Sequence, residues 1–404
     1  MINMSAGQTM LSRSCLDEMS RQMETPIYYP PYWEVEEEVR RLLGELLGAG
    51  RSDILLPAGS ATFGIEAALK SVLAPGDKVV VLNGGVFGRV MADLVRIVGG
   101  VPLEVKVPYG TAPDLDVVRR AQAEPGVKAL AAIHVETSTG TIFPVESLGA
   151  LARERNQLFL VDAISSAGGC AFDMEAWGVD LCFASPQKCL SGPQGLAIVG
   201  VSQKAWRAIE ARAEGRESDT LCLDLRVWKR YHDVKVRAAN DAWKAGSREP
   251  KALGRAAHEP SPSGPLVRGL YGALKDLFAE GPANYRKRHD LCSRAVRAGV
   301  RALGLRLVAT SEAVAAPVVT VFYLPPGLHE KDLRAYLLAR WAVAIGNGEI
   351  GDDNVRVGTM GVGAQPRNVL FTLAALEDAL ARFGHGPRSG AAVAAAQAVF
   401  DEVS

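Results

Sequence analysis

Residues 128–163 read KALAAIHVETSTGTIFPVESLGALARERNQLFLVDA, and this stretch indicates the fold. It begins and ends with apolar runs (128–136 and 157–163), and VESLGALARER (145–155) between them has apolar residues at helical spacing. A strand, a helix and a second strand in this order predict a right-handed βαβ unit with parallel strands. Because both runs are apolar throughout rather than alternating, we expect strands buried on both faces of a sheet.

The same alternation of strand-like and helix-like segments covers residues 52–202. Four more apolar runs are predicted strands: DKVVVLN (77–83), VPLEVKV (101–107), LCFAS (181–185) and GLAIVGVS (195–202). Segments with helical periodicity lie between most of the runs: ATFGIEAALKSVL (61–73), FGRVMADLVRIV (87–98) and APDLDVVRRAQA (112–123). This order predicts the α/β class, with a mainly parallel central sheet covered by helices on both faces.

The pattern changes near residue 266. Two long helical segments precede strand-like LRLVA (305–309) and VVTVFYL (318–324), and a helical segment, EKDLRAYLLARW (330–341), follows them. A chain of 404 residues is too long for one small core, so we expect several domains. The predicted parts are an N-terminal arm (1–20), a large domain (21–280) and a smaller C-terminal α+β domain (281–404).

The composition is that of an ordinary globular protein and narrows the choice of partners. The 45 basic and 45 acidic residues give a formal net charge of zero, which argues against nucleic acid or an anionic membrane as the main partner. No apolar run is long enough to span a membrane, and the first residues lack the pattern of a signal peptide. Six cysteines without CxxC or CxxH spacing predict free thiols in a reducing compartment. We therefore expect a cytoplasmic protein.

Several common site motifs are absent. The segment LNGGVFGRV (82–90) lacks the GxGxxG spacing of a dinucleotide-binding turn, and no GxSxG motif is present. The six histidines show no HExxH or paired spacing, so we expect no metal site.

Reactive side chains fall at the ends of predicted strands. Asp162 ends one strand, Thr137 follows another, and Lys188 lies in SPQKCLSGPQGL (185–196) just after a third. Ser60 begins a predicted helix after ILLPAG. Ligands of open α/β sheets bind at the carboxyl ends of the strands, and helix starts bind phosphate. Each residue alone also has a structural explanation, as a helix cap, a turn residue or a solvated loop lysine.

A lysine, a buried aspartate and a phosphate-binding helix start are together what pyridoxal phosphate requires. The lysine amine forms a Schiff base with the cofactor, and the aspartate keeps its pyridine nitrogen protonated. These segments, in this order, resemble the class V branch of the fold type I pyridoxal-phosphate-dependent aminotransferases, and most of all the alanine–glyoxylate and serine–pyruvate aminotransferase group. The resemblance extends from GQTMLSRSCLDEM (7–19) to the final helix.

The resemblance implies a set of cofactor contacts. Five segments match the family's cofactor contacts in order. PAGSATFGIEAAL matches the phosphate turn, LNGGVFG the ring-stacking segment and HVETSTG the strand-end hydroxyl. VDAISSAGG matches the segment of the pyridinium partner, and SPQKCLSGPQGL matches the Schiff-base segment. Within these segments the implied contacts are Ser60, Ala61, Thr62, Phe87, Thr137, Asp162, Gln187 and Lys188. Lys188 and Asp162 would be the catalytic residues. His258 and Ser261 stand where the family places phosphate contacts from the neighbouring subunit.

The resemblance also implies a substrate site. VRVGTMG (355–361) matches the family's carboxylate-binding motif, which assigns Arg356 to the substrate carboxylate through its planar fork. AGQTML departs from the family's opening loop behind the substrate and would contribute Gly7. The segment IYYPPYW (27–33), with Tyr28 and Tyr29, predicts either an aromatic wall over the cofactor or a docking arm for a partner subunit.

The function that we expect is transamination in a homodimer with shared active sites, from an amino acid or related amine to a 2-oxo acid. Residues 228–257, rich in Lys and Arg, are unusual, and they predict either a solvated flap or a segment that binds an anionic or nucleotide-like substrate. The alternative is therefore elimination, retro-aldol cleavage or carbon–carbon bond formation on such a substrate. Two further alternatives are an enzyme that uses the pyridoxal ring itself as substrate, against which Ser60 and Thr62 argue, and a non-catalytic ligand sensor.

Overall fold

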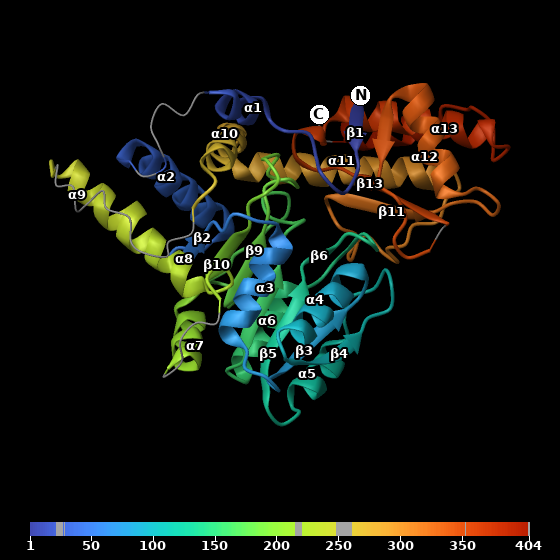
Figure 1. Ribbon diagram of the computed structural model, residues 1–404. Coiled ribbons are helices and arrows are strands. Elements are labelled where there is room, and N and C mark those ends of the chain that lie inside the picture. The colour runs from blue at the N-terminus through green and yellow to red at the C-terminus, as the bar shows by residue number, and fades with distance from the viewer. Residues whose placement is uncertain (22–26, 28, 215–219, 248–260, 352, 403–404) are drawn as a thin grey trace.

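A seven-stranded sheet forms the centre of the larger part of the protein (Figure 1). The computed structural model describes residues 1–21, 27, 29–214, 220–247, 261–351 and 353–402. In the order β2-β10-β9-β8-β5-β3-β4, the strands are β2 (Asp53–Leu55), β10 (Ile198–Val201), β9 (Leu181–Ala184), β8 (Leu158–Asp162), β5 (Val127–Ile133), β3 (Lys78–Asn83) and β4 (Val101–Lys106).

Most neighbouring strands are parallel, as predicted, but β10 is antiparallel to both β9 and β2. A parallel return needs a crossover, usually a helix, whereas residues 185–197 between β9 and β10 contain no helix. The segment with Lys188 therefore turns back along the sheet instead of crossing over it.

Helices cover both faces of the sheet (Figure 1). They are α3 (Ala61–Val72), α4 (Val86–Ile97), α5 (Leu115–Gln122), α6 (Val145–Glu154) and α7 (Gln203–Ala213). Along β3 the buried side chains alternate between two hydrophobic clusters: Val79 and Val81 pack on the face with α3 and α4, and Val80 and Leu82 pack on the face with α6. Burial on both faces explains why these strands are apolar throughout.

The C-terminal part has its own hydrophobic core. Its elements are α11 (Pro282–Ala302), β11 (Val319–Tyr323), α12 (Glu330–Trp341), β12 (Val343–Ile345), β13 (Asn354–Gly358), α13 (Pro366–Arg382) and α14 (Ala391–Asp401). β11 and β13 are antiparallel, and β1 (Ile2–Met4) pairs in parallel with β12. The predicted strand LRLVA is wrong: Leu307 forms only an isolated bridge with Phe322.

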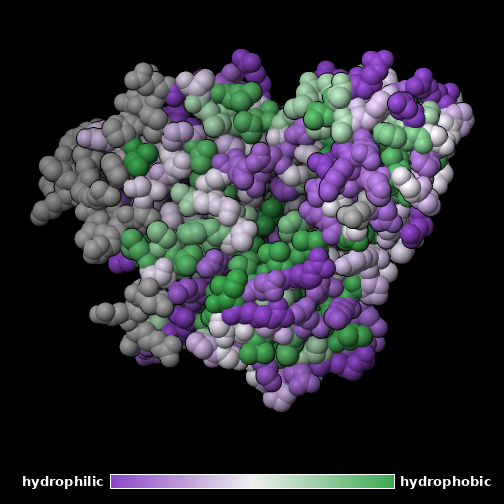
Figure 2. All heavy atoms as spheres, turned by 45° about the vertical axis from the view of Figure 1, so that its right-hand side comes forward, coloured by the Kyte–Doolittle hydropathy of each residue, from purple (hydrophilic) through white to green (hydrophobic). Residues whose placement is uncertain are grey.

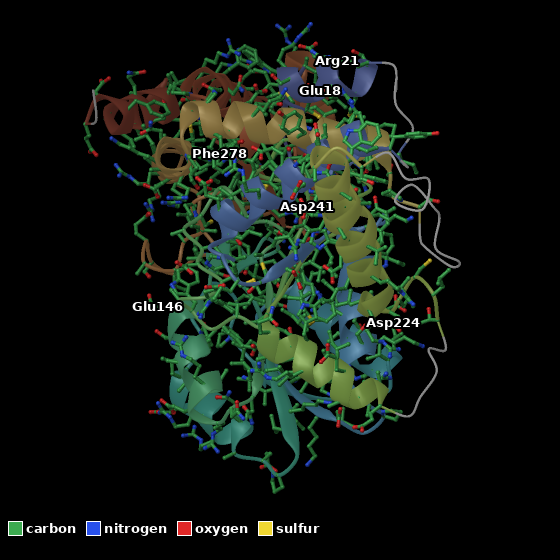
Figure 3. The ribbon with its side chains drawn as sticks, turned by 90° about the vertical axis from the view of Figure 1, so that its left-hand side faces the viewer. Glu18, Arg21, Glu146, Asp224, Asp241 and Phe278 are labelled. Atoms are coloured by element: carbon green, nitrogen blue, oxygen red, sulfur yellow. The ribbon has the colours of Figure 1, made fainter. Side chains whose placement is uncertain are left out.

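The N-terminal arm continues into α1 (Arg13–Ser20), which packs against α10 (Gly264–Glu280). Glu18 of α1 is buried and forms ion pairs with Arg268 and Lys275 of α10 (Figure 3). The arm therefore contacts the C-terminal part through β1, and it contacts α10, the helix before the C-terminal part, through α1.

A long helix follows Asp224 and includes residue Asp241 (Figure 3). It consists of α8 (Leu225–Tyr231), a π-helical segment η1 (His232–Ala239) and α9 (Asn240–Lys244). It packs against α2 (Pro30–Leu47), where the Tyr231 hydroxyl donates to Glu36 at 2.9 Å and Glu36 pairs with buried Arg40. The prediction of a solvated flap is therefore wrong for residues 228–244; residues 248–257 lie outside the described part.

The aromatic segment IYYPPYW leads into α2. Pro30 is the first residue of this helix, which suits proline because the first helical N–H has no partner within the helix. Tyr32 and Trp33 are each only 1% exposed and belong to the hydrophobic core. These two side chains therefore cannot form a wall that a substrate touches.

In the described part of the chain, no helix is both long enough and apolar enough to cross a membrane.

Candidate active site

Four of the predicted site residues meet at one edge of the central sheet. Asp162 is the last residue of β8, Lys188 follows β9, Thr137 follows β5 by way of the short strand β6 (Val135–Glu136), and Phe87 lies in the first turn of α4 after β3. The strands β9, β8, β5 and β3 are consecutive neighbours in the sheet. Their carboxyl ends therefore bring these four residues together.

Asp162 is a buried carboxylate, with 6% of its surface exposed. Its Oδ1 accepts a hydrogen bond from the Ile164 N–H at 2.8 Å. Burial, with a smaller contribution from the charge of Glu136, raises the pKa of Asp162 to about 7, while the Ile164 N–H and Lys188 act in the opposite direction. A cation placed beside this carboxylate would restore its ionised form.

Lys188 is a partly buried amine beside that carboxylate. Its Nζ donates a hydrogen bond to the carbonyl oxygen of Ala6 in the N-terminal arm. Burial and, to a smaller extent, the positive charge of Arg356 lower the pKa of Lys188 to about 8, against the opposing effects of Cys189, Glu349 and Asp162. About a tenth of the Lys188 amine is therefore uncharged at pH 7, far more than for a lysine of ordinary pKa, and the uncharged form is the nucleophile.

The backbone around Lys188 is held from several directions. The Thr9 hydroxyl donates to the Lys188 carbonyl at 2.8 Å, and the Tyr285 hydroxyl of α11 donates to the Cys189 carbonyl at 2.7 Å. The Ser191 hydroxyl accepts from the Val362 N–H at 2.8 Å, in the turn after β13. The N-terminal arm, α11 and the turn after β13 thus fix the lysine segment together.

Glu136 fixes the start of α4, where Phe87 lies. Its Oε2 accepts the N–H groups of Phe87 and Gly88, each at 3.1 Å, and its Oε1 accepts the Ser138 N–H at 3.1 Å. An anion is favoured at a helix N-terminus. A side chain at Gly85 would collide with Glu136 and Ser138, so only glycine allows this close approach.

The N-terminus of α3 provides the predicted phosphate site. The Ser60 hydroxyl accepts the Phe63 N–H at 3.2 Å as the helix cap, and Ser60 and Thr62 are exposed, whereas Ala61 is buried. The Gly59 N–H donates to the Gly195 carbonyl at 2.9 Å, which joins this turn to the segment that carries Lys188. In that segment the Gln187 side chain accepts a hydrogen bond from Ser185.

These residues fit pyridoxal phosphate. The Thr137 hydroxyl is buried and has no hydrogen-bond partner within the described residues, so it is available to a polar group of a ligand. Near it lie an amine with a lowered pKa, a buried carboxylate that a cation would ionise, and a partly buried aromatic ring on Phe87. A helix N-terminus with two exposed hydroxyls suits the phosphate.

Arg356 is buried in β13 and already has partners. Its Nε donates to the Asn347 carbonyl at 2.9 Å, its Nη2 donates to Asn347 Oδ1 at 3.3 Å, and its Nη1 donates to Glu349 Oε2 at 2.8 Å. The charge of the guanidinium lowers the pKa of Lys188, and the charge of Glu136 acts to raise the pKa of Arg356, so Arg356 lies near the predicted cofactor residues.

The remaining predicted residues are more peripheral or outside the described part. Gly7 is exposed and directly follows Ala6, the carbonyl partner of Lys188. Tyr29 is exposed at the N-terminus of α2, and Ser261 is exposed shortly before α10. Tyr28 and His258 lie outside the described residues.

Fold and site together define a pyridoxal-phosphate-binding α/β enzyme of fold type I. Residues 32–233 match the family described as Aminotransferase class-V. The chain is 33% identical over 346 residues to the pyridoxamine–pyruvate transaminase of Mesorhizobium japonicum, covering 85% of this chain and 82% of that protein. It is 32% identical to the 2-aminoethylphosphonate–pyruvate transaminase of Syntrophobacter fumaroxidans, covering 87% of this chain and 90% of that protein. The crystal structure of ureidoglycine–glyoxylate aminotransferase from Bacillus subtilis is 29% identical, with a TM-score of 0.87 and coverage of 99% of this chain and 97% of that chain.

The chain belongs to the class V aminotransferase family. It is a pyridoxal-phosphate-dependent aminotransferase, and the predictions of family, fold class, cofactor and enzyme class are confirmed.

Three features of the site were not predicted from the sequence. The Ala6 carbonyl as partner of Lys188 has no signature, because any residue supplies a backbone carbonyl. Glu136 was not predicted as a site residue, although an acid followed by small hydroxyl residues at a strand end is a signal for such an anchor. Glu349, the partner of Arg356, lies in the loop GNGEIG (346–351), which has the composition of a simple turn.

Proposed function

We propose that Lys188 holds pyridoxal phosphate covalently and that Asp162 pairs with its pyridine nitrogen. Phe87 stacks on the ring, Thr137 bonds to its polar edge, and the α3 turn with Gln187 holds the phosphate. When bound, the cofactor accepts the amino group of the donor and draws electrons away from the bond that is broken at the donor carbon. The observation that carries this assignment is the meeting of Lys188 and Asp162 at the ends of adjacent strands, with pKa values shifted in opposite directions.

Lys188 also moves the proton in this proposal. Once the donor replaces it, its amine would take a proton from the donor carbon and pass it to the cofactor carbon that had carried the lysine. In the second half-reaction it would return a proton to the carbonyl carbon of the 2-oxo acid. A pKa of about 8 suits this role, because such an amine both accepts and releases protons near neutral pH.

Arg356 orients the carboxylate of the 2-oxo acid. Its guanidinium is buried in β13, and a buried fork-shaped cation discriminates strongly in favour of a planar carboxylate. The relatives are named for pyruvate and glyoxylate as acceptors, so we propose a small 2-oxo acid of this type.

A homodimer in the cytoplasm is part of the proposal. In Figure 2, hydrophobic side chains form a band across the middle of the view, and a partner subunit would cover such a surface. In the dimer, Ser261 and His258 would reach the phosphate of the partner's site, and Tyr28 and Tyr29 would lie at the interface. Buried free cysteines support a reducing compartment. We retain 1–20, 21–280 and 281–404 as the proposed division of the chain.

The alternative of unusual chemistry on a nucleotide-like substrate loses much of its support. It depended on the aromatic and basic residues of 228–257 and on IYYPPYW. Trp228 and Tyr231 are buried in the helix that packs on α2, and Tyr32 and Trp33 are buried as well. None of these four rings is available to a substrate.

The test is a pair of half-reactions with the purified holoenzyme. A panel of primary amines is added one at a time, and the loss of the cofactor's visible absorbance band is followed. Pyruvate or glyoxylate is then added, and the band should return as the cofactor regains its aldehyde form. If no amine removes the band, or if a 2-oxo acid does not restore it, transamination by this site is excluded.

A further inference from the structure

The carboxylate-binding arginine of the proposed site is paired inside the protein. Glu349 Oε2 and Arg356 Nη1 are 2.8 Å apart. Asn347 occupies two more donors, Nε and Nη2, on another edge of the guanidinium. A guanidinium has five N–H donors, and a bidentate carboxylate needs two of them side by side. A substrate carboxylate that approaches Nη1 therefore competes with Glu349.

The two members of the pair differ in their freedom to move. Arg356 lies within the β11–β13 pair, and its side chain is 6% exposed, whereas the side chain of Glu349 is 22% exposed. The loop backbone is held: Gly346 forms a bridge with Arg356, and a side chain at Gly348 would collide with the backbone of Asn354. The Glu349 side chain, which is partly exposed to solvent, is therefore the member of the pair that is freer to turn away.

The charge of Glu349 has opposite consequences for two kinds of ligand. A ligand with a carboxylate at Arg356 meets a like charge, so Glu349 must turn away first. A ligand without a carboxylate leaves Glu349 in place, and the buried arginine keeps its partner. Without Glu349, a ligand that lacks a carboxylate would leave the buried Arg356 unpaired, which is strongly unfavourable. The ion pair therefore favours ligands without a carboxylate.

In transamination, one site must bind a ligand with a carboxylate and, in the other half-reaction, a ligand that can lack one. The acceptor proposed above, a 2-oxo acid, carries a carboxylate. The donors after which two relatives are named, pyridoxamine and 2-aminoethylphosphonate, are primary amines without one. An arginine whose charge is balanced by a movable internal acid suits such an alternation, because each state of the site has a paired arginine.

We propose that Glu349 determines the substrate specificity of this aminotransferase: it stays on Arg356 when the donor, a primary amine without an α-carboxylate, is bound, and it leaves Arg356 when the carboxylate of the 2-oxo acid arrives. This inference rests on the proposed function, in which Arg356 receives the acceptor. It adds the class of the donor and assigns a role to Glu349.

The first test measures binding without catalysis. The holoenzyme is titrated with propionate, an unreactive monocarboxylate, by calorimetry. Replacing Glu349 by Gln removes the charge and keeps the shape, so the Kd for propionate should fall about tenfold. Asp353→Asn removes a charge from an exposed position near the same loop and serves as the matched control, with an expected change of less than about twofold. Equal Kd values in E349Q and D353N would overturn the proposal.

The second test compares two donors that differ by one group, alanine and ethylamine. The rate constant of the donor half-reaction is measured for each from the loss of the cofactor band. In E349Q the ratio of alanine to ethylamine should rise about tenfold over the wild-type ratio, and E349D should lie nearer to wild type. An unchanged ratio contradicts the role of Glu349. A wild-type enzyme that reacts with no amine contradicts the proposed function instead, and the propionate titration still decides the role of Glu349.

Discussion

Lys188 and Asp162 lie at the ends of neighbouring strands of the seven-stranded sheet, whereas Arg356 comes from the β11–β13 pair and its partner Glu349 from a loop. The cofactor side is fixed by backbone geometry, since each residue follows a buried strand. The substrate side is fixed by an ion pair between side chains, one of which reaches solvent. In the proposed site, cofactor chemistry is thus built into the sheet, and substrate choice is left to side chains that can change without disturbing the sheet.

The largest effect is expected on the cofactor side. Lys188→Ala should reduce turnover at least about 10³-fold, because the site loses both its nucleophile and its proton carrier. The visible absorbance of the covalently held cofactor should disappear as well. Thermal unfolding of the variant should remain cooperative, since Lys188 is only partly buried. Lys331→Ala, at an exposed position of α12, is the control and should leave absorbance and turnover unchanged.

Asp162→Asn tests the charge opposite the pyridine nitrogen. We expect kcat to fall about 10²-fold, because an amide does not stabilise a protonated ring. The protein without cofactor should respond differently. The pKa of Asp162 is raised to about 7 on folding, so the wild type loses stability as the pH rises from about 4 through 7, where the buried group ionises. Melting temperatures of the cofactor-free variant should lack this decline; an identical pH profile would argue against the raised pKa.

Arg356→Leu probes the substrate side. The KM for the 2-oxo acid should rise about 100-fold, because a charge-assisted bidentate contact is lost, while the cofactor still binds. Loss of the Arg356 charge also raises the pKa of Lys188 above about 8. At pH 7.5, attachment of added pyridoxal phosphate to the cofactor-free protein should therefore be slower than in wild type. Arg340→Leu on exposed α12 is the control, and an effect of equal size there would remove the special role of Arg356.

Gly85→Ala should have the smallest effect, confined to the cofactor side. The added methyl group collides with Glu136 and Ser138 and shifts the start of α4, so Phe87 moves relative to the cofactor. We expect the Kd for pyridoxal phosphate to increase about tenfold, with no change in the affinity for propionate. Gly44→Ala is the matched control, because Gly44 lies in α2 and the nearest atom to its added carbon is 3.9 Å away. Weaker propionate binding in G85A would show that the two sides are coupled.

Elements with strong local patterns were predictable. EKDLRAYLLARW was expected as a helix and forms α12 over the same residues, Glu330–Trp341. The strands β3 and β8 lie within the predicted runs, and β5 begins one residue before its run, because continuous apolar stretches are typical of strands buried on both faces. The direction of β10 was not predictable from its own sequence, because it depends on the absence of a crossover helix before it.

Helices stabilised by distant partners were harder to predict. The charges of residues 228–244 resemble a solvated segment, yet Tyr231 pairs with Glu36, which is remote in the sequence. In the site, the strand-end residues Lys188, Asp162 and Thr137 were found from local position. Glu349 was missed because only the fold of β12 and β13 brings its carboxylate to the guanidinium of Arg356.

The pairing of β1 with β12 has a consequence for the time at which the enzyme is completed. Ile2–Met4 pair with Val343–Ile345, and the nearby Ala6 carbonyl is the hydrogen-bond partner of Lys188. At synthesis rates of about 5–20 residues per second, the roughly 340 residues between the two strands take on the order of 20–60 seconds to appear. The first strand therefore waits for its partner during synthesis, and this pairing fixes the arm that carries Ala6 only after Ile345 has been made. We therefore expect capture of the cofactor to follow the synthesis of β12.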